Sequence, residues 1–228
     1  MQANQSKARE QAVTIRIAAA RLEGELVIPE TARGLVLFAH GSGSSRHSPR
    51  NQYVARVLQD AGIATLLFDL LTEAEERQES HTGYLRFDIS LLAKRLMEVT
   101  NWVTAQAATR HFKLSYFGSS TGAAAALMAA AELGDKINSV VSRGGRPDLA
   151  GPALGRVSAA TLLIVGGNDT SVIELNVEAY AQLRCEKTLK LIPGATHLFE
   201  EAGALEQVSH LASEWFVAHL PSPKTHLS

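Results

Sequence analysis

The chain lacks the features that mark disulfide-stabilised, zinc-binding and membrane proteins. It has a single cysteine, Cys185, which excludes an internal disulfide and a cysteine-based zinc site and indicates a reducing, cytoplasmic location. No stretch of 18 uncharged apolar residues is present, and residues 1–11 are polar, so the sequence predicts neither a membrane span nor a signal peptide. The formal net charge is −1, without a long run of one sign, which argues against nucleic-acid and anionic-membrane partners and favours a small-molecule substrate.

The composition is that of an ordinary globular protein. Hydrophobic residues make up 46% of the 228 residues and charged residues 20%, which is enough apolar material for one sizeable core. We therefore expect a single domain over residues 12–220. Residues 1–11 are expected to be a flexible N-terminal segment and residues 221–228 a loose C-terminal tail.

Short apolar runs rich in β-branched residues alternate with longer segments that have helical spacing. This alternation predicts an α/β fold, with a mostly parallel sheet and helices on both faces. An antiparallel pair is expected at 12–18 and 24–29, and buried parallel strands at 34–39, 64–68, 113–117, 137–141, 161–165 and 188–192. Helices are expected at 50–60, 87–105, 121–133, 171–183 and 204–219.

The pentapeptide GSSTG at 118–122 has the pattern G-x-S-x-G. It directly follows a predicted strand and directly precedes a predicted helix, which is the context that a nucleophilic serine on a sharp turn requires. Ser120 is therefore the candidate nucleophile. The alternative is a plain strand-to-helix turn in which the serine only caps the helix.

Two further segments follow in the chain order that this fold uses for a catalytic triad. Asp169 comes after the predicted strand at 161–165, and His197 comes after the last predicted strand. His197 is expected to act as general base and Asp169 to orient it. Asp169 could instead be only a helix cap, and His197 only a loop histidine. Asp148 is a second candidate for the acid, although its surroundings favour a short capped helix.

The segment HGSGSS at 40–45 follows a predicted strand and supplies flexible backbone. Its Ser42 N–H and the Thr121 N–H are the expected oxyanion-hole donors. A phosphate loop is the competing interpretation of these glycines. We discount nucleotide binding because the sequence lacks both Gly-Lys-Ser/Thr and G-x-G-x-x-G spacing.

Basic residues near these loops could pair with a substrate carboxylate. Arg46, His47 and Arg50 flank the 40–45 segment, and Arg143 and Arg146 follow the predicted strand at 137–141. Solvated or structural ion pairs are the favoured interpretation, because such pairs are common. No metal site is expected, since metal-ligand spacing is absent from His81, His111, His210 and His226.

These motifs resemble the α/β-hydrolase superfamily, and in size and layout the dienelactone hydrolase-like proteins. The resemblance spans about residues 34–220 and is carried by HGSGSS at 40–45, GSSTG at 118–122, GGND at 166–169 and GATHLFEE at 194–201. It implies a central sheet of eight strands, a triad of Ser120, Asp169 and His197, and hydrolysis of ester bonds without a cofactor.

The chain departs from dienelactone hydrolases proper, which carry a cysteine nucleophile where this sequence has Ser120. Serine favours ordinary carboxylic esters or lactones, cleaved through an acyl-enzyme. The segment 71–86 is too short for a large lid, so an open site for small esters is expected. Thioester cleavage, peptide cleavage, acyl transfer and a non-catalytic binding scaffold remain as alternative functions. The sequence leaves open whether the chain forms a homodimer.

Overall fold

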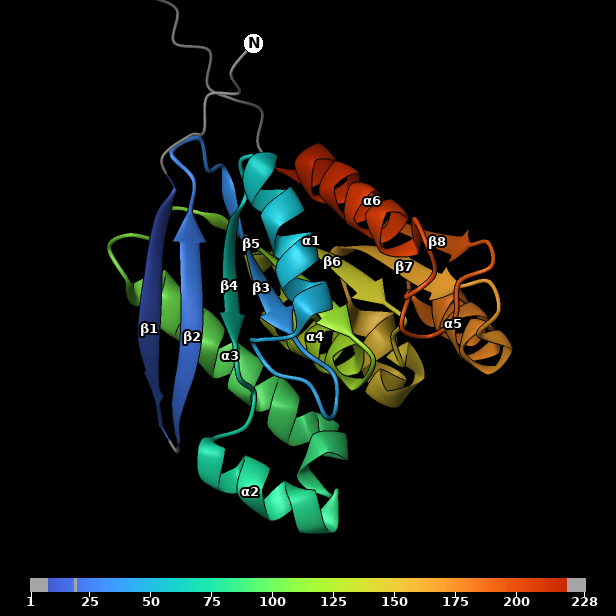
Figure 1. Ribbon diagram of the computed structural model, residues 1–228, viewed down its shortest axis with the longest axis horizontal. Coiled ribbons are helices and arrows are strands. Elements are labelled where there is room, and N and C mark those ends of the chain that lie inside the picture. The colour runs from blue at the N-terminus through green and yellow to red at the C-terminus, as the bar shows by residue number, and fades with distance from the viewer. Residues whose placement is uncertain (1–7, 19, 221–228) are drawn as a thin grey trace, which may run out of the picture.

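The strands of the computed structural model, which describes residues 8–18 and 20–220, form one sheet (Figure 1). They are β1 (Arg9–Ile17), β2 (Ala20–Ile28), β3 (Gly34–Ala39), β4 (Ala64–Phe68), β5 (Lys113–Ser119), β6 (Ile137–Arg143), β7 (Ala160–Gly166) and β8 (Lys187–Ile192). The eight strands lie in the order β1-β2-β4-β3-β5-β6-β7-β8. β1 and β2 are antiparallel to their neighbours, and β4, β3 and β5 to β8 run parallel. The predicted α/β-hydrolase fold is confirmed.

The antiparallel edge is longer than the sequence pattern predicts. β1 pairs with β2 from Arg9, which lies opposite Ile28. Residues 9–11, which we expected in the N-terminal segment, are therefore part of the sheet. Residues 1–7, together with the tail predicted at 221–228, lie outside the described residues.

The helices cover both faces of the sheet (Figure 1). They are α1 (Pro49–Asp60), α2 (Glu73–Thr82), α3 (Ile89–Ala105), α4 (Thr121–Leu133), α5 (Thr170–Gln182) and α6 (Ala204–His219). α1 and α6 pack on one face over a core that contains Phe38, Phe117 and Phe216. α3 and α4 pack on the other face, where the buried Tyr116 donates or accepts a hydrogen bond of 2.6 Å with Thr100. Each face thus has its own apolar core, and the strand ends between them remain available for a site.

Helix α2 occupies the segment at 71–86, for which we predicted no element. The Thr72 hydroxyl accepts from the Glu75 N–H at 3.3 Å, and Glu75 Oε2 accepts from the Thr72 N–H at 2.7 Å. This reciprocal pair is a capping box. Arg95 Nη1 also donates to Glu75 Oε2 at 2.6 Å, which ties the start of α2 to α3.

Candidate active site

Ser120 lies at the sharp turn between β5 and α4. Its φ of 50° and ψ of −123° are strained for a residue with a side chain. A Cβ on Gly122 would lie 2.1 Å from the carbonyl oxygen of Ala39, and one on Gly118 would lie 2.5 Å from Ala123 Cα. Both glycines of the motif are therefore required by close backbone approach. The Ser120 side chain makes no capping hydrogen bond, so the helix-cap alternative is wrong.

Asp169 and His197 meet at the same end of the sheet. Asp169 follows β7, His197 follows β8, and His197 Nδ1 lies 2.7 Å from Asp169 Oδ2. Asp169 stands at the start of α5, but its side chain caps nothing there. The carboxylate favours the tautomer with hydrogen on Nδ1, which leaves Nε2 free to accept a proton. The rival Asp148 accepts from Arg146 at 2.9 and 2.8 Å instead.

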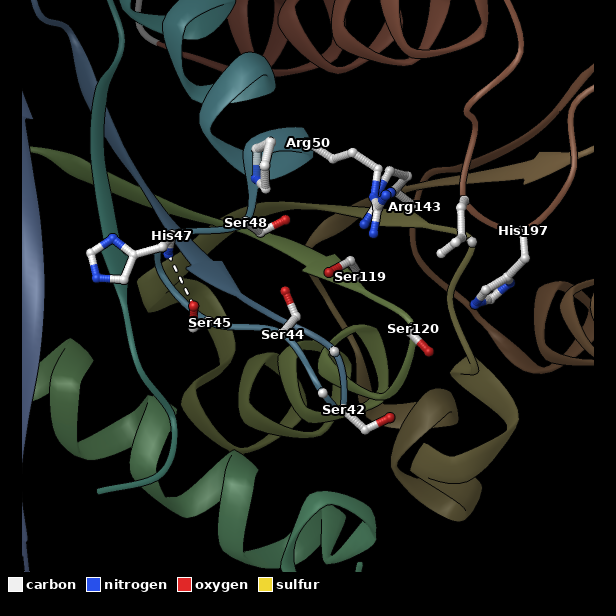
Figure 2. A pocket seen from close by; sticks show the side chains of 15 residues that line it. Ser42, Ser44, Ser45, His47, Ser48, Arg50, Ser119, Ser120, Arg143 and His197 are labelled. Atoms are coloured by element: carbon white, nitrogen blue, oxygen red, sulfur yellow. Dashed lines mark hydrogen bonds between the residues drawn. The ribbon is translucent and has the colours of Figure 1, made fainter. Parts of the chain in front are cut away.

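Ser120 and His197 line one pocket of about 460 Å³. Figure 2 shows the Ser120 hydroxyl on the side of the pocket that faces the His197 ring. No hydrogen bond joins the two side chains among the contacts of the described residues. In free enzymes such catalytic hydrogen bonds are commonly long and shorten when substrate binds.

The loop at 40–45 is held by a buried histidine. The Leu70 N–H donates to His40 Nε2 at 3.0 Å, so the hydrogen of the neutral ring is on Nδ1, which donates to the Gly41 carbonyl at 3.0 Å. Burial lowers the pKa of His40, which opposes its protonation. The position of the loop beside Ser120 therefore depends on a neutral ring.

The two predicted oxyanion-hole residues are in contact. The Ser42 N–H donates to Thr121 Oγ1 at 3.1 Å, across 79 positions of the chain. The structure thus places both residues next to Ser120. In this state, however, the Ser42 amide already has an acceptor, the Thr121 hydroxyl.

The predicted substrate-binding residues divide into two groups. Arg46 forms an ion pair with Asp69 and lines a neighbouring cavity. His47 reaches the pocket that contains Ser120, but in Figure 2 its ring points away from the serine. Arg143, at the end of β6, lines this pocket and is only 7% exposed. The structural ion-pair interpretation is confirmed for Arg46 and is wrong for Arg143, which has no carboxylate partner among the described residues.

Arg143 is joined at the pocket by Arg50, which the sequence also offered as a possible partner for a substrate carboxylate. Both side chains line the pocket (Figure 2). Burial, and then the nearby positive charge of Arg50, lowers the pKa of Arg143 to about 10. Sequence position next to the 40–45 loop was the signal for Arg50, but burial of Arg143 could not be read from the sequence.

The described residues offer neither a metal site nor a membrane-spanning helix. No group of three or more histidine, cysteine, aspartate or glutamate side chains is placed to hold a metal ion. Across 8–18 and 20–220, every helix is too short or too polar to cross a membrane.

Among known proteins, a relative of solved structure matches nearly the whole chain. A dienelactone hydrolase from Anabaena variabilis is 58% identical, with 94% of this chain and 99% of that chain covered and a TM-score of 0.92. Carboxyl esterase 2 from Tuber melanosporum shares the fold at 14% identity, with 96% and 89% covered and a TM-score of 0.70.

The curated relatives are longer proteins. A Mycobacterium tuberculosis protein named provisionally as a phosphoribosyl transferase is 55% identical over 215 residues, which are 94% of this chain and 48% of that protein. The chain thus spans about half the length of the curated relatives it matches. No protein-family model matches it. By its near-complete match to the Anabaena variabilis protein, the chain belongs to the dienelactone hydrolase family of the α/β-hydrolase fold.

Proposed function

We propose that the protein is a serine hydrolase that cleaves small carboxylic esters or lactones through an acyl-enzyme on Ser120. The observation that carries this proposal is the 2.7 Å contact between His197 Nδ1 and Asp169 Oδ2, in a site whose pocket also contains the strained Ser120. A nucleophile, a base and an orienting carboxylate are the three parts that acyl transfer requires.

The proposed reaction gives each of these groups a role. His197 Nε2 accepts the Ser120 proton as Oγ attacks the ester carbonyl, and Asp169 stabilises the imidazolium that forms. Backbone amides of Ser42 and Thr121 stabilise the negative oxygen of the tetrahedral intermediate, and the Ser42 amide then exchanges the Thr121 hydroxyl for this oxygen. The imidazolium returns the proton to the departing alcohol, and water repeats the sequence to release the acid.

The pocket favours small substrates. It is about 460 Å³, and the described residues that line it lie in loops, at strand ends and at the start of α1, with none from the 71–86 segment. The name of the Mycobacterium tuberculosis relative belongs to a longer protein, of which the match to this chain covers 48%.

The test is hydrolysis of 4-nitrophenyl acetate by the purified protein and two serine variants. Ser120→Ala should lower kcat by about 10⁴-fold or more, because the members of a triad act as a unit. Ser158→Ala, at an exposed position outside the pocket, is the matched control and should keep its activity. Equal activity of wild type and Ser120→Ala would refute the proposal. A folded wild type that cleaves no ester or thioester would favour a binding scaffold.

A further inference from the structure

Two arginines on the wall of the active-site pocket carry more positive charge than their neighbours neutralise. Arg143 Nε and Nη1 are buried without a hydrogen-bond partner, and so is Arg50 Nε. Arg50 Nη1 donates to Glu200 Oε1 at 3.0 Å, and the Glu200 side chain is 64% exposed. The guanidinium carbon of Arg143 lies 5.8 Å from the centre of the Phe199 ring, which compensates its charge only in part. The pair therefore retains about one uncompensated positive charge.

A buried cation without a counter-ion is costly, because the free energy of its lost hydration is not recovered. Among the residues that the structure describes, Glu200 is the one carboxylate bonded to the pair, and no aspartate or glutamate lines the pocket. Arg143 is 7% exposed beside Ser120, and two of its nitrogens lack an acceptor, so it is placed for an anion that arrives with the substrate.

Several other polar side chains of the pocket are hydroxyls, which can donate hydrogen bonds to an anion. Figure 2 shows the hydroxyls of Ser44, Ser48 and Ser119 around the same space as the Arg143 guanidinium. The first turn of α1 begins here, at Pro49, with Ser48 as its cap. A helix N-terminus adds a partial positive charge of about +0.5 and favours anions.

We infer that this pocket binds a phosphate group of the substrate between Arg143 and Arg50, so that the ester cleaved at Ser120 belongs to a phosphorylated small molecule. The charge of the site, about +1 from the arginines and Glu200 and about +0.5 from the helix, matches a phosphate monoester of about −1.5 to −2. A phosphate also offers three acceptor oxygens to donors that lie on several sides. A carboxylate offers two oxygens in one plane and a single charge. The inference rests on the proposed function for the reaction, but phosphate binding does not depend on it.

Calorimetric titration with inorganic phosphate at pH 7.5 and low salt tests the binding directly. Wild type should bind phosphate more tightly than acetate, and Arg143→Met should lower the affinity for phosphate at least tenfold. Arg143→Lys, which keeps the charge, should retain part of the affinity and shows that a loss is not caused by misfolding. Arg156→Gln is the matched control, because Arg156 pairs with Glu132 outside the pocket, and it should bind as wild type does. Absence of phosphate binding, equal affinity for acetate, or unchanged binding by Arg143→Met would overturn the inference.

A set of three acetate esters tests whether the pocket recognises a phosphate group of the substrate during turnover. The esters are 2-acetoxyethyl phosphate, 3-acetoxypropanoate and 2-acetoxyethanol, and acetic acid release is followed by titration at constant pH. Wild-type kcat/KM should be at least tenfold higher for the phosphate ester than for the other two, and Arg143→Met should remove this preference. If no ester is cleaved but phosphate still binds, the proposed function fails and the phosphate site stands. If the neutral ester is cleaved and the phosphate ester has no advantage, the phosphate inference fails alone.

Discussion

Replacing Asp169 by asparagine removes the charge that faces His197 and keeps the size of the side chain. The 2.7 Å bond between Nδ1 and Oδ2 holds the ring tautomer and stabilises the imidazolium. At an effective dielectric constant of about 20, two unit charges about 4 Å apart attract by about 4 kcal/mol. An asparagine that donates its N–H to Nδ1 would also place the hydrogen on Nε2, which could then not accept the Ser120 proton. We therefore expect kcat/KM to fall by about 10²- to 10⁴-fold, from a loss of about 3–5 kcal/mol in transition-state stabilisation.

The assay is initial-rate hydrolysis of a chromogenic acetate ester, with near-ultraviolet circular dichroism to confirm the fold. Asp148→Asn is the matched control, because Asp148 is bonded to Arg146 instead of a histidine. It should change kcat/KM by less than about threefold, because this partly exposed ion pair contributes little and does not touch His197. If Asp148→Asn is the damaging change and Asp169→Asn is harmless, our assignment of the acid is refuted.

Three further predictions concern stability, each measured as the free energy of unfolding in urea. Gly122→Ala should destabilise the protein by about 3 kcal/mol or more, because its Cβ would lie 2.1 Å from the Ala39 carbonyl oxygen, and an unchanged midpoint would contradict that packing. Arg95 lowers the pKa of Glu75 from 4.5 to about 2, so this pair should stabilise the fold above pH 4.5, and its contribution should be lost as the pH falls toward 2. Solvent screening limits that contribution to about 1–2 kcal/mol, and a Glu75→Gln variant with the same acid dependence as wild type would refute it. Arg143→Met should raise stability by about 1–3 kcal/mol, since it removes an uncompensated buried charge, and a loss of stability would show that the guanidinium is already satisfied.

Local patterns predicted the strand and the helix around Ser120 well. The helix expected at 121–133 is observed with the same bounds as α4, because its alanine-rich sequence is strongly helical and its start is marked by the GSSTG turn. Helix α2 was missed because it is polar and has no apolar periodicity. The capping-box pattern of Thr72 and Glu75 and the acidic residues of the first turn were its local signals. The first residues of β1 were missed for a similar reason, since Arg9, Glu10 and Gln11 form an exposed end of an edge strand.

The residues of the candidate triad could be predicted from the sequence, but the charge balance of the pocket around them could not. The order of Ser120, Asp169 and His197 along the chain indicated that they meet, because loops at the carboxyl ends of parallel strands lie together. Their catalytic roles stay predictions until activity is measured. Which arginines are neutralised depends on contacts between distant segments, as in the pair of Arg46 with Asp69. The exposure and partners of Arg143 therefore become visible only in the folded structure.

Covalent labelling of the nucleophile tests the central claim most directly. Wild-type protein treated with a fluorophosphonate should gain one adduct per chain, which peptide mass spectrometry should locate on Ser120. His197→Ala should react far more slowly, because the serine loses its base. A folded wild type that gains no adduct, or an adduct on another residue with Ser120 unmodified, would contradict the account.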